Sequence, residues 1–107
     1  MVDSSINLVI RRYLQAVNDA GIHARRAVLF GSHARGNAHE WSDIDLLVIA
    51  PELDQTDHRN WVSVLWELRA DTDSRIEPIP CGEREWETDD GRPILEIARR
   101  EGIAISV

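Results

Sequence analysis

The sequence predicts a single α/β (α+β) domain, residues 1–107, in which a small mixed sheet of about three to four strands is packed by helices. Two observations lead to this fold class. Short apolar runs of strand length alternate with segments in which apolar residues recur at helical spacing. The chain also has the size of one compact domain, and its 43% apolar and 29% charged residues are typical of a globular protein that buries a core.

The first predicted element is an amphipathic helix that begins at Ser4 or Ser5, either of which can cap it, and stops at Gly21. Its apolar positions recur at helical spacing: Ile6, Val9, Ile10, Tyr13, Leu14 and Val17. Residues 27–30 follow as a short buried strand, which we expect to end in a tight turn at Gly31.

Residues 43–49 form the predicted central strand, because they are apolar on both faces beyond the first three positions. The segment 51–58 is polar and rich in turn residues. A second long helix comes next, with one apolar face made of Trp61, Val64, Leu65 and Leu68. On its flank, Val62 and Trp66 either widen the core-facing side or form an exposed apolar patch for a helical partner.

Residues 75–80 form the third predicted strand, whose two prolines place it at a sheet edge or near a bulge. The acidic segment 82–92 is expected to be a solvated loop. A last helix opens at Pro93 and stops at Gly102. The remaining residues 103–107 are a tail or a short strand.

The charge composition excludes several classes of function. All 12 cationic residues are arginine, so no mechanism that needs a lysine nucleophile, a lysine Schiff base or a phosphate-loop lysine can operate. The net charge of -7 opposes binding to a phosphate backbone, and we expect no direct nucleic-acid partner. No paired spacing of His and Cys indicates zinc, and Cys81 is expected to be a small buried hydrophobe rather than a nucleophile.

The sequence contains no long apolar stretch. The first residues carry no basic region ahead of an apolar run, and no window approaches the roughly 18 apolar residues of a membrane span. The one cysteine cannot form an internal disulfide. We therefore expect a cytoplasmic protein with no membrane partner.

Two aspartates begin the central strand and carry the most informative pattern. Asp43 and Asp45 are two positions apart, so on a strand their side chains point the same way with Cα atoms roughly 6.6 Å apart. Both carboxylates could then converge on two cations about 3.5 to 4 Å apart, as in two-metal phosphoryl transfer. The alternative is that they only begin a strand after a turn. Trp41, just before them, could stack on a base, although packing within the loop is expected.

The turn before these aspartates could bind an anion. Gly31 and Ser32 end one strand and open a short helical segment, so that free N–H groups, the Ser32 hydroxyl and the Arg35 guanidinium could converge on a phosphate. The alternatives are an ordinary turn and a solvated arginine.

The sequence resembles the signature of the minimal nucleotidyltransferases, a branch of the polymerase-β-like nucleotidyltransferase superfamily. The resemblance is carried by Gly31-Ser32, the run from Ser32 to Gly36 and the run from Ser42 to Leu46. The resemblance covers nearly the whole chain and implies a palm-like fold. It implies that Gly31 and Ser32 hold the nucleotide triphosphate, helped by Arg35.

The same resemblance implies that Asp43 and Asp45 bind two Mg²⁺ ions and that a third acidic residue on a neighbouring strand completes the catalytic and metal site. We predict Glu77 for that position, with Asp73 and Asp71 as competitors. The family usually has aspartate there. The alternative for Glu77 is an edge-strand charge that opposes aggregation.

The resemblance further implies a Mg²⁺-dependent enzyme that transfers a nucleoside monophosphate, AMP from ATP, to a hydroxyl. Minimal nucleotidyltransferases commonly pair with an all-helical HEPN-domain protein in toxin-antitoxin modules. The expected acceptor is therefore a tyrosine of a HEPN toxin, and this protein would be the antitoxin in a hetero-oligomer. The alternatives are a non-catalytic binding antidote or scaffold and a small-molecule, antibiotic-type nucleotidyltransferase, which the short chain disfavours.

Overall fold

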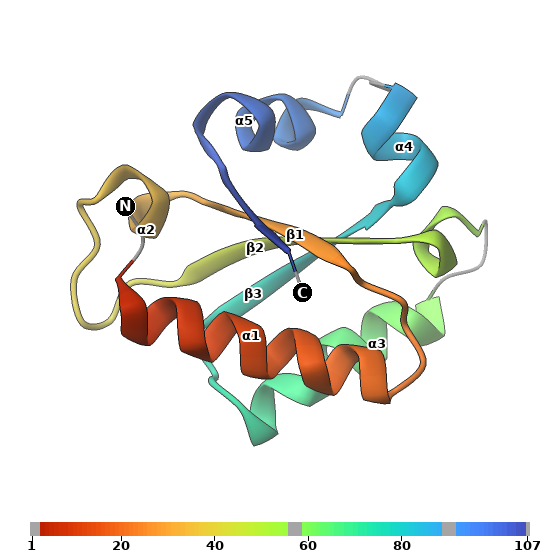
Figure 1. Ribbon diagram of the computed structural model, residues 1–107, viewed down its shortest axis with the longest axis horizontal. Coiled ribbons are helices and arrows are strands. Elements are labelled where there is room, and N and C mark those ends of the chain that lie inside the picture. Colours follow the sequence, from red (N-terminus) through yellow and green to blue (C-terminus); the bar gives the residue numbers. More distant parts are fainter. Residues whose placement is uncertain (1–2, 56–58, 89–91, 107) are drawn as a thin grey trace.

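The computed structural model describes residues 3–55, 59–88 and 92–106 and confirms the predicted fold class. One sheet of four strands has the order β3-β2-β1-β4, and its strands are β1 (Arg26–Phe30), β2 (Ile44–Ala50), β3 (Ile76–Gly82) and β4 (Ile103–Ser106) (Figure 1). β1 pairs antiparallel with both β2 and β4, whereas β2 and β3 run parallel. The sheet is therefore mixed, with β3 and β4 at its edges.

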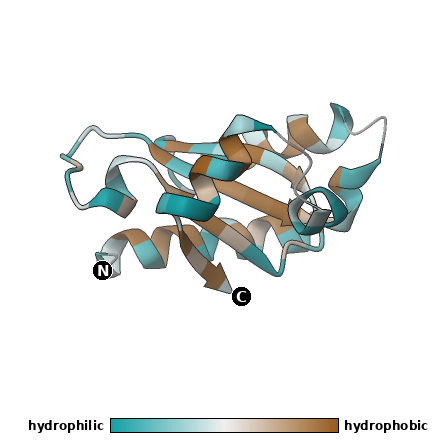
Figure 2. Cartoon of the chain, turned by 90° about the horizontal axis from the view of Figure 1, so that it is seen from above, coloured by the Kyte–Doolittle hydropathy of each residue, from teal (hydrophilic) through white to brown (hydrophobic). Residues whose placement is uncertain are grey.

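Helices cover both faces of the sheet (Figure 1). α1 (Ser4–Asp19) and α3 (Arg59–Glu67) lie on one face, and α4 (Glu83–Thr88) and α5 (Pro93–Glu101) lie on the other. The hydrophobic residues concentrate in the strands between these layers, while the outward sides of the helices are mixed or hydrophilic (Figure 2). A single turn of helix, α2 (Ser32–Arg35), stands at the end of the sheet where β1 stops and β2 begins.

The alternation of β2 divides the core between the two faces. Leu46 and Val48 pack in the cluster under α1 and α3, whereas Leu47 and Ile49 pack in the cluster under α4 and α5. All four side chains are fully buried, or nearly so. This two-sided burial is what the uninterrupted apolar run predicted, and it makes β2 the rigid central element of the sheet.

Most predicted elements are confirmed, and three details are corrected. The cap of α1 is Asp3 rather than Ser4 or Ser5, because its carboxylate accepts a 2.8 Å hydrogen bond from the Ser5 N–H. β2 begins at Ile44, so Asp43 lies just before the strand. The residues after 102, expected to be a tail or a short strand, form the short edge strand β4 as one of those two alternatives.

The third correction concerns the acidic segment 82–92, which was expected to be a loop. Its first part is the helix α4, and residues 89–91 lie outside the described residues. Asp54, about thirty positions earlier, accepts hydrogen bonds from the N–H groups of Arg84 and Glu85 at 3.0 and 3.3 Å. A capping group so distant in sequence leaves no local signal, which explains the error.

Two other expectations are confirmed, one by the sheet topology and one by burial. β3, with its two prolines, lies at a sheet edge. Cys81 is buried, and burial raises the pKa of its thiol to about 11, as fits a packing residue rather than a nucleophile. Within the part of the chain that the structure describes, no helix is long and apolar enough to cross a membrane.

Candidate active site

A tight turn joins β1 to α2 and depends on glycine. Gly31 has a φ of 76°, a backbone conformation that side chains disfavour, and it redirects the chain from the strand into the helix. Its carbonyl accepts hydrogen bonds from the N–H groups of Ala34 and Arg35 at 3.1 and 3.0 Å. Gly36, with a φ of 80°, ends the helix after one turn. The turn thus holds the partly buried Ser32 at the end of the sheet.

Asp45 lies directly against this turn. It is the second residue of β2, and Phe30, the last residue of β1, is its register partner. A Cβ atom added to Gly31 would lie only 2.2 Å from Oδ2 of Asp45. The glycine therefore serves two purposes: it permits the turn and it leaves room for the Asp45 carboxylate.

Glu77 stands beside Asp45 on the neighbouring strand. The two are register partners in the parallel pair of β2 and β3, so their side chains lie on the same face of the sheet. Burial raises the pKa of Glu77, and the charges of Asp43 and Asp45 raise it further, together with a side-chain hydrogen bond to Asp43. Burial and then the charge of Asp43 likewise raise the pKa of Asp45. The fold thus brings the three predicted carboxylates into one cluster.

The two competitors of Glu77 are placed differently. Asp73 is held by Arg75, whose guanidinium donates to both carboxylate oxygens, with 2.8 Å from Nη2 to Oδ2. That hydrogen bonding lowers the pKa of Asp73, so its charge is already compensated. Asp71 is exposed at the end of η2 (Leu68–Asp71). Glu77 is therefore the third acidic group that shares the electrostatic environment of Asp43 and Asp45.

Cationic groups of α2 act on this cluster from one side. Arg35 and His33 both lower the pKa of Asp45, against the larger effect of burial. Arg35 has 48% of its side chain exposed and makes a long 3.5 Å contact with Glu101 of α5. Such an exposed contact is weak, so the guanidinium can turn toward an anion bound at the Gly31 turn.

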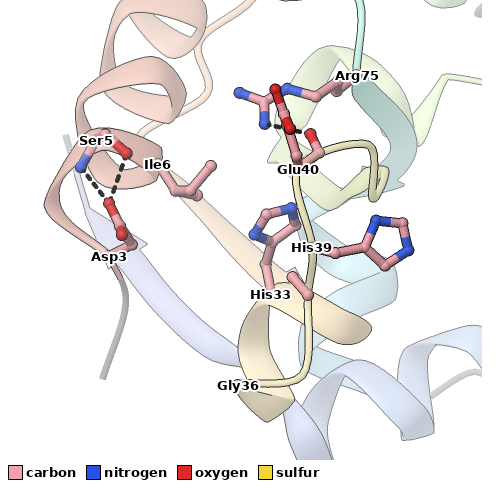
Figure 3. A pocket seen from close by; sticks show the side chains of 9 residues that line it. Asp3, Ser5, Ile6, His33, Gly36, His39, Glu40 and Arg75 are labelled. Atoms are coloured by element: carbon pink, nitrogen blue, oxygen red, sulfur yellow. Dashed lines mark hydrogen bonds between the residues drawn. The ribbon is translucent and has the colours of Figure 1, made fainter.

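A cleft of about 390 Å³ adjoins the turn (Figure 3). His33 stands on its floor, with the beginning of α1 on one side and the loop after α2, together with Arg75, on the other (Figure 3). The cleft is lined by Asp3, Ser5, Ile6, His33, Gly36, Ala38, His39, Glu40 and Arg75. None of the three clustered carboxylates lines it. His33 connects the cleft with the carboxylate cluster, because it lines the cleft and also lowers the pKa of Asp45.

Sequence reasoning missed the residues that brace the loop before β2. His33 Nε2 lies 3.4 Å from the Ser42 carbonyl oxygen, and Arg75 donates to the Glu40 carbonyl at 3.4 Å. Neither contact has a sequence signal: Arg75 lies 35 positions from Glu40, and His33 lies nine positions from Ser42, which is no regular helical or strand spacing. Trp41, in that loop, is 78% exposed, so the expectation that it packs within the loop is wrong.

The donor chemistry of the cluster fits a divalent cation. Carboxylate oxygens are the ligands that Mg²⁺ prefers. The electrostatic repulsion among the three carboxylates is relieved when a cation binds between them. No group of three or more His, Cys, Asp or Glu side chains within residues 3–55, 59–88 and 92–106 stands in a ready-made metal-binding arrangement. Binding would therefore include adjustment of side-chain rotamers.

Comparison with known proteins identifies the family. A sequence model of the nucleotidyltransferase domain matches residues 10–90. A protein of Methanocaldococcus jannaschii named "Putative protein adenylyltransferase" is 43% identical over 54 residues, which are 50% of this chain and 37% of that protein. The chain therefore spans well under half the length of this relative.

Two solved structures share the fold. A crystal structure described as "a putative nucleotidyltransferase from Sulfolobus solfataricus" has a TM-score of 0.66 at 15% identity, covering 92% of this chain and 77% of that one. A second, described as "the toxin-antitoxin with AMP-PNP", has a TM-score of 0.60 at 21% identity, covering 92% and 70%. These likenesses concern the fold, whereas the match over residues 10–90 covers most of the sequence: the chain belongs to the nucleotidyltransferase domain family.

Proposed function

We propose that this protein is a Mg²⁺-dependent nucleotidyltransferase that transfers AMP from ATP to a hydroxyl group of a protein, a tyrosine of a HEPN-type partner that it neutralises as an antitoxin. The observation that carries the proposal is the cluster of Asp43, Asp45 and Glu77 against the Gly31 turn. An anion-binding turn beside a group of carboxylates is the combination that metal-assisted nucleotidyl transfer requires.

The triphosphate of ATP would bind at the turn between β1 and α2. The first N–H groups of a helix have no intrahelical acceptors, and here they stand beside the Ser32 hydroxyl. Arg35 would add a charge-assisted hydrogen bond to the leaving phosphates after giving up its weak contact with Glu101. These residues bind and orient the nucleotide.

Asp43, Asp45 and Glu77 would hold the metal. When bound, Mg²⁺ supplies charge neutralisation for the phosphates and acidifies the attacking hydroxyl. The raised pKa values of Asp45 and Glu77 describe the cluster without a cation, and cation binding favours the ionised forms of both.

The transfer balances as a single displacement. The acceptor oxygen forms a bond to the α-phosphorus, the bond between that phosphorus and the bridging oxygen breaks, and pyrophosphate leaves. The hydroxyl proton passes to a base, and Glu77 is the candidate, because it stands beside Asp45 on the neighbouring strand and is ionised once the cation is bound. Glu77 is only partly buried on the edge strand, so it is accessible to the acceptor.

The choice of acceptor rests on the relatives. One matched protein is named for protein adenylylation, and one structure that shares the fold is a toxin-antitoxin protein with AMP-PNP. Both names support transfer of AMP to a protein within such a module. The HEPN-type partner and its tyrosine come from the resemblance of the sequence motifs.

The test combines the protein with a HEPN-type candidate partner, ATP and Mg²⁺, and measures the intact mass of the partner. The partner should gain one AMP, and peptide mapping should place it on a tyrosine. The Asp43→Asn, Asp45→Asn double variant should give no gain, whereas Glu96→Gln, an exposed acid of α5, should behave as wild type.

Different failures have different meanings. If no mass gain occurs with any acceptor or nucleotide, the proposed enzyme activity is wrong. If the double variant still neutralises the partner in cells as well as wild type does, the protein acts as a binding antidote. Calorimetry tests the nucleotide site separately: Ser32→Ala should weaken ATP binding by roughly 1 to 2 kcal/mol, and Arg35→Ala should weaken it as well.

A further inference from the structure

Trp41 is the most exposed large hydrophobic side chain within residues 3–55, 59–88 and 92–106. Its exposed fraction is 78%, compared with 51% for Leu8 and 41% for Trp66. Single exposed hydrophobic residues are common and need no explanation by themselves. The position of Trp41 is what distinguishes it, because it lies two residues before Asp43, which puts the two Cα atoms within about 7 Å of each other.

The turn that carries Trp41 is fixed by its own hydrogen bonds. The His39 N–H donates to Ser42 Oγ at 2.9 Å, and the Ser42 N–H donates back to the His39 carbonyl at 3.0 Å. The Trp41 N–H donates to Nδ1 of the His39 ring at 3.3 Å. The backbone on both sides of the indole is thus held in one conformation.

Two neighbouring elements brace the same turn. Arg75, just before β3, donates to the Glu40 carbonyl (Figure 3). Its guanidinium is itself held by Asp73. His33 of α2 reaches the Ser42 carbonyl. A large aromatic group on a turn fixed in this way loses little conformational entropy when it binds something, which is the property of a preorganised binding residue.

The groups assigned to the nucleotide in the proposed function are all polar. Ser32 and Arg35 serve the phosphates, and the three carboxylates serve the metal, so the base still needs a partner. A purine ring offers a flat, weakly hydrated face for which an indole is a suitable stacking surface. Trp41 lies in the loop that runs from α2, which carries Ser32 and Arg35, to Asp43 just before β2.

We propose that Trp41 is the stacking surface for the base of the bound nucleotide. The inference rests on the proposed function, because it adds the base to a nucleotide whose phosphates lie at the Gly31 turn. Since every base has a π face, stacking on Trp41 contributes affinity for nucleosides in general rather than a choice among bases.

The test separates the base from the phosphates. Calorimetry measures the binding of ATP and of inorganic triphosphate, each with Mg²⁺, to wild type, Trp41→Ala and Trp41→Phe. Trp41→Ala should bind ATP roughly 5- to 100-fold more weakly, the range of one base stacked on an aromatic residue, and should bind triphosphate as wild type does. Trp41→Phe should retain most of the ATP affinity.

Trp66→Ala is the matched control, because Trp66 is also exposed but lies on α3. It should bind ATP as wild type does. Thermal melting of each variant checks that the fold is intact, and an exposed side chain should be removable without loss of stability.

Unchanged ATP affinity in Trp41→Ala would overturn the proposal. If that variant binds ATP normally but transfers less AMP to its protein acceptor, the indole contacts the acceptor instead. Equal losses for ATP and triphosphate would also overturn it, because the substitution would then act on the phosphate site. If wild type transfers no AMP, the proposed enzyme activity is wrong. The binding measurements test Trp41 independently of that result, because they depend only on the nucleotide site.

Discussion

Gly31 and Asp45 are in contact across the end of the sheet: the backbone of the glycine leaves no room for a Cβ atom, which would lie 2.2 Å from the aspartate Oδ2. The turn proposed to hold phosphate and the carboxylate proposed to hold metal therefore pack directly against each other. A side chain at position 31 would have to push the Asp45 carboxylate aside.

A methyl group at position 31 should therefore damage the site more than the same change at position 36. Gly36, with a φ of 80° and a ψ of 15°, is in the left-handed helical region, where alanine costs about 1 to 2 kcal/mol of backbone strain, whereas Gly31, with a φ of 76° and a ψ of -154°, is in a region that essentially only glycine adopts. Gly36 has nothing within 4 Å of the added atom, whereas Gly31→Ala also displaces Asp45. Urea denaturation should show a larger loss for Gly31→Ala, and equal losses would contradict the contact.

Crowding of the three carboxylates predicts a response to cations. Mg²⁺ should raise the melting temperature of wild type, because it binds the folded state and offsets the repulsion. Asp43→Asn should melt at a higher temperature than wild type without Mg²⁺ and should lose the response. A wild-type melting temperature that stays constant on titration with Mg²⁺ would be evidence against a metal site.

The third carboxylate can be identified by turnover. Glu77→Gln keeps the shape of the side chain and removes its charge, so AMP transfer should fall by about 10²- to 10⁴-fold, the range for loss of a general base. Asp73→Asn, its matched control, should lower turnover far less, because Asp73 is engaged with Arg75. The reverse result would move the third carboxylate from Glu77 to Asp73.

The ion pair of Asp73 and Arg75 predicts a pH dependence of stability. The hydrogen bonds from Arg75 lower the pKa of Asp73, so the folded state favours the ionised carboxylate. This contribution is fully present above the ordinary pKa of 3.8 and disappears as the pH falls through the lowered value. Asp73→Asn should therefore be less stable than wild type at pH 7 by roughly 1 to 2 kcal/mol, with the difference shrinking below about pH 4. Denaturation curves of both proteins across this range provide the measurement.

Asp54 should stabilise a helix to which it does not belong. It accepts hydrogen bonds from two N–H groups at the beginning of α4, so Asp54→Ala should lower the free energy of unfolding by about 1 kcal/mol, as for loss of a helix cap. Asp19→Ala, an exposed aspartate at the end of α1, is the control. Similar stabilities of the two variants would exclude the capping role.

Much of the fold could be predicted because its signals are local. The two-sided apolar run of β2 indicates a strand buried on both faces, and the prolines of β3 indicate a strand at a sheet edge. What the sequence could not indicate depends on contacts between distant segments: the cap of α4, the pairing of β4 with β1, and the brace from Arg75 to Glu40.

The candidate site divides in the same way. The spacing of Asp43 and Asp45 predicted that the two side chains share a side, which is a local property. That Glu77 lies beside Asp45 depends on the parallel register of β2 and β3, which no local pattern specifies. The exposure of Trp41 could not be predicted either, because a hydrophobic side chain is expected to pack. In the structure the ring lies in solvent on a turn that is fixed by hydrogen bonds.

The prolines of β3 have a consequence for self-association. Pro78 and Pro80 are two positions apart, so their nitrogen atoms lie on the same side of the strand, and β3 is paired with β2 along its whole length on the other. An extended chain that approached the outer edge of β3 would find two of its carbonyl groups without donors, which disfavours sheet growth into fibrils. Glu77, at the beginning of β3, can thus remain accessible to substrates without the adjacent edge becoming a template for aggregation.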